Sequence, residues 1–221
     1  IKYPSLYEFY KSSKPSLLVA EHGRSYDFGL EKFFPEKGLN FDITYFNHSY
    51  KDMIEGQDRT GYVSQNVSGT VRSQGVEFIS RFKPSNFSNF NLNYTYSSTY
   101  DGADFDDPAI PSYFINSQMV RVPRHFLNLG TKYIFPDKNL NLTLQTKLSS
   151  KVRDYGNVNE PANGSYDDVK LNSYMVNDLS LNYNLFDTYK IFFKIDNILD
   201  KVYSTALGYN QMDRSFNFGI K

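Results

Sequence analysis

The feature that most constrains this chain is a strict alternation of polar and apolar residues. Residues 89–96 read Asn-Phe-Asn-Leu-Asn-Tyr-Thr-Tyr, so an extended chain would place all the apolar side chains of this segment on one face. The alternation returns at 139–148 and 178–185, and further copies are at 24–34, 39–50, 70–83, 122–135, 189–198 and 212–221. No segment predicts a convincing amphipathic helix. The pattern therefore predicts an all-β chain of about nine strands.

The lengths of the strands and connections separate two classes of all-β protein. Strands of soluble sandwiches average about 5–6 residues, whereas strands that cross a membrane need about 9–11 residues. Several of the alternating segments reach the longer length. The connections are short at 35–38, 83–86, 136–139 and 186–188, and long at 51–69, 101–121, 154–172 and 200–212. We therefore predict an antiparallel up-and-down transmembrane β-barrel, with tight turns at one rim and long loops at the other.

Composition excludes several other classes of protein. Tyr and Phe number 19 each, an aromatic content that argues against disorder, and no apolar run approaches the roughly 18 residues of a membrane-spanning helix. Lys+Arg and Asp+Glu both number 24, so the basic footprint of a nucleic-acid-binding protein is missing. The absence of cysteine excludes disulfides and thiolate metal sites.

The two faces of such a barrel have opposite surroundings. The Phe, Leu, Tyr and Ile face is expected to meet lipid, and the polar face to line the lumen. Aromatic residues expected at the short-turn rim are Phe33, Phe34, Phe41, Phe82, Phe87, Phe90, Phe135, Phe186 and Tyr189, and a second group near the long loops is Tyr50, Tyr96, Tyr100, Tyr155, Tyr174 and Tyr203. Charged residues with lumen-facing parity are Asp27, Glu31, Asp42, Glu77, Arg81, Lys132, Lys194 and Asp196.

Several motifs resemble those of one family, the TonB-dependent outer-membrane receptors. Residues 3–10, Tyr-Pro-Ser-Leu-Tyr-Glu-Phe-Tyr, are similar to an early family stretch, and residues 24–31 resemble its Ser-x-x-x-Glu-x-Gly-x-Glu strand with Asp27 in place of the usual Glu. Residues 75–77 and 122–125 fit two further signatures. The most specific match is 197–203, Asn-Ile-Leu-Asp-Lys-Val-Tyr, which is followed by Gly208-Tyr209 and Arg214-Ser215-Phe216.

The resemblance implies that residues 1–221 are the C-terminal portion of a larger barrel domain. Transporters of this kind have about 22 strands, so this chain would supply about nine to ten of them. The family's plug domain and its segment for a TonB-type energy-coupling protein are not in this chain. We expect the charged lumen-facing residues to contact the plug rather than only to solvate a channel.

Two departures from the family pattern bear on the C-terminal end. Met212-Asp213 precedes Arg214 where the family usually has Pro-Gly, so a different local turn is expected here. The chain stops at Gly219-Ile220-Lys221 where the family ends in an aromatic residue, and a few terminal residues are expected to be missing.

The function implied by the resemblance is energy-coupled uptake of a large scarce nutrient across the bacterial outer membrane. Cobalamin and a ferric siderophore are equally favoured as the ligand, and outer-membrane lipid, the plug and the coupling protein are the other expected partners. Loop aromatics that could stack on such a ligand are Tyr62, Tyr100, Tyr155, Tyr166 and Tyr209. A passive outer-membrane porin and a soluble β-sandwich ligand-binding module are the alternatives.

The sequence offers no catalytic constellation and implies no cofactor. The acidic residues Asp104, Asp106 and Asp107 are weak candidates for a calcium site, and a solvated loop is the simpler interpretation. An outer-membrane protease could pair Asp106 and Asp107 with His125. Against this, His125 shares the parity of the lipid-facing Leu127 and Leu129. The chain is therefore predicted not to be an enzyme.

Overall fold

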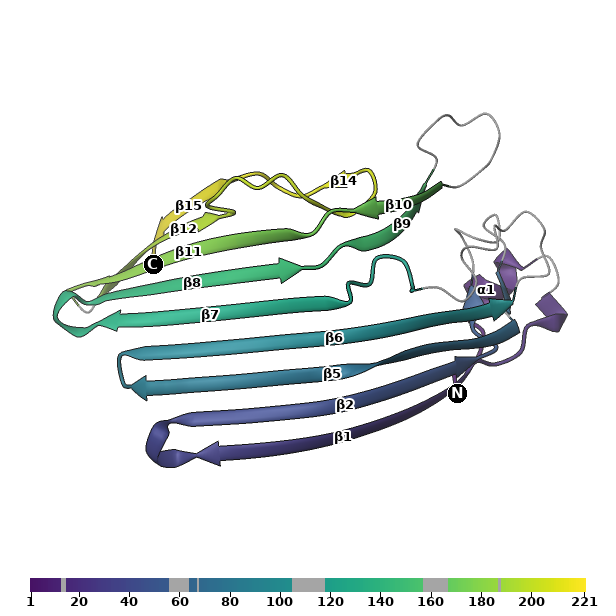
Figure 1. The fold of residues 1–221 in the computed structure, drawn as a ribbon. Coiled ribbons are helices and arrows are strands. Elements are labelled where there is room, and N and C mark those ends of the chain that lie inside the picture. Colours follow the sequence, from purple (N-terminus) through teal and green to yellow (C-terminus); the bar gives the residue numbers. More distant parts are fainter. Residues whose placement is uncertain (13–14, 56–63, 67, 105–117, 157–166, 187) are drawn as a thin grey trace. The chain divides into compact units, whose positions relative to one another are not determined.

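A computed structural model describes residues 1–12, 15–55, 64–66, 68–104, 118–156, 167–186 and 188–221. Its main feature is a nine-stranded sheet, whose strand order follows the order along the chain (Figure 1). The strands are β1 (His22–Phe34), β2 (Leu39–Lys51), β5 (Ser68–Ser85), β6 (Ser88–Asp104), β7 (His125–Phe135), β8 (Leu140–Ser149), β11 (Tyr174–Leu185), β12 (Tyr189–Asp196) and β15 (Ser215–Ile220). The predicted meander of about nine strands is confirmed, and the sheet is not closed.

Shorter elements occupy the N-terminal segment and the long connections. They are α1 (Leu6–Lys11), η1 (Pro15–Leu17), and the hairpins β3 (Ile54–Glu55) with β4 (Gln65–Asn66), β9 (Val152–Gly156) with β10 (Asp167–Leu171), and β13 (Ser204–Ala206) with β14 (Tyr209–Asn210). The sequence did not predict α1. This helix begins with a capping box, in which Ser5 and Glu8 exchange hydrogen bonds with each other's backbone. None of the described helices is long and apolar enough to cross a membrane.

Two of the tight turns share one design. Pro35–Lys37 (η2) and Pro136–Lys138 (η4) are single 3₁₀ turns, and each ends in a left-handed residue, Gly38 with φ 59° and Asn139 with φ 49°. Proline fixes φ at the first helical position, and Gly and Asn tolerate the left-handed region at the end. A side chain at position 38 would collide with the carbonyl oxygen of Lys83. The turn sequence therefore reverses the chain between neighbouring strands.

The described chain divides into two compact units. One comprises 1–28, 45–75 and 98–119, and the other comprises 29–44, 76–97 and 120–221. In the first unit, the Nζ atom of Lys2 lies 3.0 Å from Glu8 and 2.9 Å from Glu21, and the backbones of residues 2 and 21 are hydrogen-bonded. These contacts attach the N-terminal segment to the start of β1.

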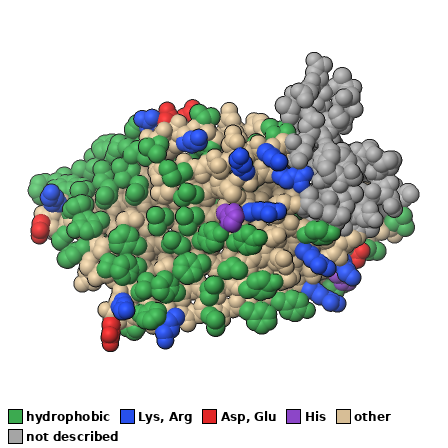
Figure 2. Space-filling model, viewed as in Figure 1, with side chains coloured by type: hydrophobic (Ala, Val, Ile, Leu, Met, Phe, Trp, Pro, Cys, Tyr) green, Lys and Arg blue, Asp and Glu red, His purple; other side chains and the backbone are tan. Residues whose placement is uncertain are grey.

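Strand register in the second unit keeps the two faces distinct. In the pairs across β8, β11, β12 and β15, one row is Leu142, Leu181, Phe193 and Phe218. The neighbouring row on the other face is Thr143, Ser180, Lys194 and Asn217. The period of two read from single strands thus continues across the sheet, and Figure 2 shows hydrophobic side chains spread over the face in view.

Within the described residues, no second layer of structure covers the apolar face of the sheet. Among the described residues, only Val71 and Val176 are buried hydrophobic side chains. Large ones are exposed along β1, including Phe28 at 72% and Leu30 at 77%. An apolar surface this extensive needs a nonaqueous environment or a partner, because water disfavours contiguous apolar patches.

Candidate functional site

The polar face of the second unit carries charges linked by hydrogen bonds. Lys194 Nζ lies 2.6 Å from Asp196 Oδ1, and the other oxygen of Asp196 accepts a hydrogen bond from Asn217 at 3.3 Å. Glu31 accepts a hydrogen bond from Asn40 at 2.8 Å. These links hold exposed and half-exposed charges in place on the polar face of the sheet.

In the first unit, a similar contact between polar side chains joins Asp27 and His48. His48 Nε2 lies 3.2 Å from Asp27 Oδ1, and its ring centroid lies 5.4 Å from that of Phe46. His48 was not among the site residues predicted from the sequence. A signal was available, because His48 has the same parity along β2 as Asp42 and Thr44, whose side chains are themselves hydrogen-bonded at 3.1 Å.

All eight charged residues predicted to face a plug lie in strands of the main sheet. The register places Lys132 opposite Thr143, and Lys194 between Ser180 and Asn217, in polar rows. Asp27 belongs to the first unit and the other seven belong to the second. Their contact with a plug stays a prediction.

The loop tyrosines predicted to contact a ligand are not brought together by the described structure. Tyr100 on β6 and Tyr209 on β14 are 44% and 71% exposed, and they belong to different units. Tyr155 is placed in β9 through its backbone alone. Tyr62 and Tyr166 lie outside the described residues, as do the calcium candidates Asp106 and Asp107. Asp104 ends β6, and only its backbone is described.

A buried carboxylate joins three segments at the base of the long loops. Asp154 on β9 is fully buried; it accepts hydrogen bonds from Arg121 Nε at 2.9 Å and from the backbone N–H of Leu207 at 2.6 Å. The backbone N–H of Arg121 also donates to the carbonyl of Arg153 at 2.7 Å. No local sequence pattern marks Asp154 as a site residue, because its partners lie 33 and 53 residues away.

The residues of the motif at 197–203 fasten the last long loop. Asn197 is 3% exposed; its backbone N–H donates to Asp178, and its side-chain amide exchanges hydrogen bonds with the backbone of Lys201, each at 2.9 Å. The backbone N–H of Arg214 donates to Asp200 at 2.9 Å, and the Arg214 guanidinium lies 3.4 Å from the same carboxylate. The arginine thus reaches the motif even though Met212-Asp213 precedes it.

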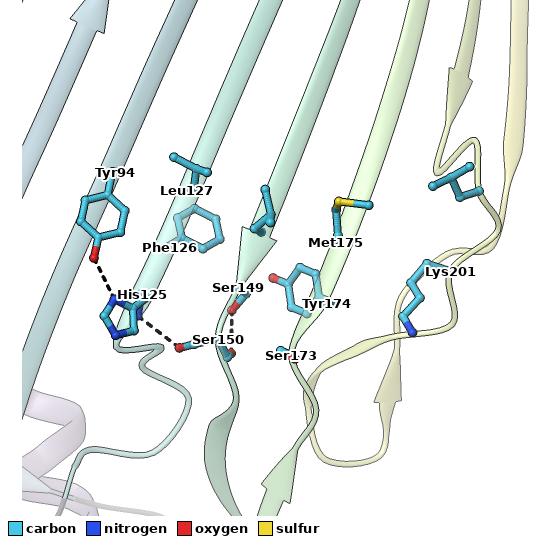
Figure 3. A pocket seen from close by; sticks show the side chains of 12 residues that line it. Tyr94, His125, Phe126, Leu127, Ser149, Ser150, Ser173, Tyr174, Met175 and Lys201 are labelled. Carbon is cyan, nitrogen blue, oxygen red and sulfur yellow. Dashed lines mark hydrogen bonds between the residues drawn. The ribbon is translucent and has the colours of Figure 1, made fainter.

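A pocket of about 640 Å³ lies at the loop end of β6, β7, β8 and β11 (Figure 3). The Tyr94 hydroxyl is 2.8 Å from His125 Nδ1, and the backbone N–H of His125 donates to Ser150 Oγ at 3.1 Å. Tyr94 pairs with Leu127, which pairs with Leu148, so the pocket opens on the aliphatic face. The predicted parity of His125 is confirmed, because it pairs with Tyr96 in this face.

An aromatic pair lies beside this pocket. Tyr174, which lines the pocket, and Tyr203 in the last long loop have ring centroids 4.5 Å apart. Burial raises the pKa of the Tyr203 hydroxyl, with smaller contributions from Tyr174 and Asp178. The Tyr203 phenol therefore stays neutral near pH 7, and its contact with Tyr174 is one of aromatic packing.

Comparison with known proteins decides the family. A family model described as TonB dependent receptor-like, beta-barrel, matches residues 1–198. The chain belongs to this family. The TonB-dependent receptor match thus covers most of the chain, in agreement with the motifs and with the meander of the main sheet.

Individual relatives are distant in sequence and close in fold. The vitamin B12 transporter BtuB of Vibrio cholerae is 24% identical over 99% of this chain. The pyoverdine outer membrane receptor FpvA of Pseudomonas aeruginosa superposes with a TM-score of 0.74 at 18% identity, over 96% of this chain and 31% of that protein. The ferric-catecholate import receptor Fiu of E. coli gives 0.71 at 15% identity, over 100% and 29%. This TonB-dependent receptor chain spans 32% of the length of BtuB.

Proposed function

We propose that this chain forms part of the barrel wall of an outer-membrane receptor that imports cobalamin or a ferric siderophore by energy-coupled transport. Residues 1–221 would be the C-terminal portion of the barrel domain. A plug and a TonB-type coupling protein would be supplied by the rest of the receptor and by the inner membrane. The reaction class is transport, and no step of it makes or breaks a covalent bond.

The observation that carries the proposal is the division of one continuous sheet into two faces. Aliphatic and aromatic side chains predominate in the rows of one face. Amide, hydroxyl and charged side chains predominate in the rows of the other face, although Ile134 and Phe192 also lie there. A sheet of this kind suits a wall with lipid on one side and a wet or plugged lumen on the other. The ion pairs of the polar face leave hydrogen-bonding capacity for a polar plug surface.

The choice of ligand is supported by the relatives. Among them, BtuB is named as a vitamin B12 transporter, FpvA as a pyoverdine receptor and Fiu as a ferric-catecholate import receptor. These ligands are large and carry flat or aromatic groups, which exposed loop tyrosines such as Tyr100 and Tyr209 could stack on. Equal weight stays on cobalamin and on iron chelates.

The test uses the full-length receptor that carries this chain, in outer membranes. Deletion of 104–118 or 158–168 should weaken binding of the transported ligand at least tenfold, about 1.4 kcal/mol, while heat-modifiable migration of the barrel persists. Most residues of these two ranges lie outside the part of the chain that the structure describes. Binding would be measured with cyanocobalamin and with a panel of ferric siderophores. Unchanged binding in both deletions would assign recognition to the plug or to other strands.

A second measurement separates the proposal from a passive porin. Uptake by the receptor should stop when the inner-membrane proton gradient is collapsed, because energy coupling drives the proposed transport. Steady ion conductance in planar bilayers, with solute flux that is independent of the gradient, would instead identify a porin.

A further inference from the structure

A groove of about 650 Å³ lies within the first compact unit, where β1, β2 and β5 approach the long loops. Four of its lining residues carry basic side chains: His22, Arg24, Lys51 and Arg72. Its other polar side chains are Asn47, Ser49, Thr70, Gln74 and Asp52, and Asp52 is the one acid among the described lining residues. We call this feature the basic groove.

The basic groove opens on the apolar face of the sheet. Arg24 has the same parity along β1 as Tyr26 and Phe28, which are 58% and 72% exposed. Asn47 on β2 donates hydrogen bonds both to Gln74 of β5 and to the hydroxyl of Tyr45, so these three side chains share that face. The polar-face pair formed by Asp27 and His48 has the opposite parity.

Along one face of β1, the side chains therefore change from cationic to aromatic. His22 and Arg24 come first, nearest the long loops, and Tyr26 and Phe28 follow toward the short turns. In Figure 2, Lys and Arg side chains gather on the same face as the hydrophobic ones, toward the loop end. A lipid at a membrane surface has this order of chemistry, with an anionic headgroup above apolar chains.

The cations of the basic groove are available to a ligand. Arg24, Lys51 and Arg72 are exposed, and none of the three forms an ion pair with any acid of the described chain. Arginine binds phosphate in a bidentate manner through its planar guanidinium, and such charge-assisted hydrogen bonds are stronger than neutral ones. Three cations against one carboxylate leave the groove positive at neutral pH.

We propose that the basic groove binds the phosphate of a phosphorylated lipid in the outer leaflet, with the acyl chains lying over Tyr26 and Phe28. Arg24 and Arg72 clamp the phosphate from β1 and β5, Lys51 adds a third positive charge, and Ser49 and Thr70 supply hydroxyl donors. The assignment to the outer leaflet rests on the proposed function, which places the long loops outside the cell. Lipid binding itself is separate from nutrient transport.

The test is lipid binding by the full-length receptor in detergent, measured by native mass spectrometry while diphosphorylated lipid A is titrated. The double variant Arg24→Gln/Arg72→Gln should bind this lipid at least about tenfold more weakly than the wild type. Arg24→Lys/Arg72→Lys should keep part of the affinity, because the charge remains without the bidentate geometry. The matched control is Lys32→Gln, on the same strand and parity but near the short turn. It should bind as the wild type does.

Two further titrations determine whether the ligand is a lipid. Diacylglycerol, which carries no phosphate, should bind the wild type and the double variant equally, which also shows that the variant is folded. Inorganic pyrophosphate should compete with lipid A only weakly, because it lacks acyl chains. Equal lipid A affinity in the wild type and the double variant would overturn the proposal, as would pyrophosphate binding as tight as lipid A binding. If the wild-type receptor binds lipid A as expected but imports neither cobalamin nor any ferric siderophore, the proposed function would be wrong and the lipid site would still stand.

Discussion

At the scale of single residues, neighbouring side chains on one strand have opposite surroundings. Leu181 pairs with Leu142 and Phe193 on the aliphatic face, whereas the next residue, Asn182, lies on the opposite face and pairs with Asn141 and Phe192. Leu181→Arg in the full-length receptor should cost about 2–4 kcal/mol if the side chain meets lipid near the bilayer centre. Unfolding in lipid vesicles, followed by tryptic protection, would measure this cost.

Asn182→Arg is the matched control for that substitution. It places the same charge one residue along the strand, on the face expected to be wet, and should cost far less. Equal costs at positions 181 and 182 would mean that both faces meet the same environment, and the assignment of the two faces would be wrong.

Asp154 provides the second test at this scale. Asp154→Ala removes the acceptor for Arg121 Nε and for the backbone N–H of Leu207. The cost should be about 1–3 kcal/mol, because a buried donor loses its partner while half-exposed Arg121 regains water. Hydrogen exchange of 118–122 and 204–210 should accelerate, and exchange in β8 and β11 should not change. Uniform acceleration across the sheet would show instead that Asp154 supports the whole barrel.

At the scale of elements, the short N-terminal helix α1 depends on ionisation of Glu8. A hydrogen bond from the Ser5 backbone N–H, aided by Lys2, lowers the pKa of the Glu8 carboxyl below its ordinary value of 4.5. A lowered pKa in the folded state means that the stabilisation is present above pH 4.5 and is lost as pH falls through the folded pKa. Hydrogen exchange of residues 5–11, corrected for intrinsic rates, should therefore rise as the pH is lowered below 4.5.

Glu8→Gln supplies the control for this pH dependence. The amide keeps a hydrogen-bond acceptor but has no charge to titrate, so helix protection should be lower at pH 7 and flat with pH. The same acid-induced rise in the Gln variant would assign the effect to another group.

The elements also show what the sequence could and could not predict. Long alternating segments predicted all nine strands of the main sheet, because the period of two is a direct consequence of burying or wetting alternate side chains. The predicted strand at 122–135 begins at His125, since Pro123 has no N–H for a ladder. Helix α1 and the hairpin β13–β14 are too short to show a period.

The candidate site likewise has features that the sequence could predict and features that it could not. Parity alone predicted the polar rows that contain Lys132 and Lys194. The Asp154 and Asn197 networks depend on how loops fold back onto distant segments, and no spacing in the sequence encodes that path. The ligand tyrosines lie in those same loops, so their grouping is equally beyond a local pattern.

At the scale of the whole molecule, the open sheet predicts how the isolated chain behaves. Strands β1 and β15 stand at the two ends of the strand order, and each has one edge without a partner strand in the main sheet. Together with the exposed aromatic face, these edges favour association between chains. Residues 1–221 expressed alone in water should therefore aggregate, as judged by light scattering and sedimentation. A monodisperse soluble monomer with a cooperative melt would contradict the membrane assignment.

The strand order has a consequence for how such a wall can change during evolution. Every strand of the main sheet is bonded only to its sequence neighbours in that sheet, so a hairpin is a self-contained piece of chain that enters and leaves at the same rim. Duplicating or deleting one hairpin preserves the direction of every later strand and the side on which its loops emerge. A single added strand would invert all that follows. Insertions and deletions in related receptors should therefore be tolerated in steps of two strands. Whole long loops could be exchanged, while the tight turns that begin with proline stay unchanged.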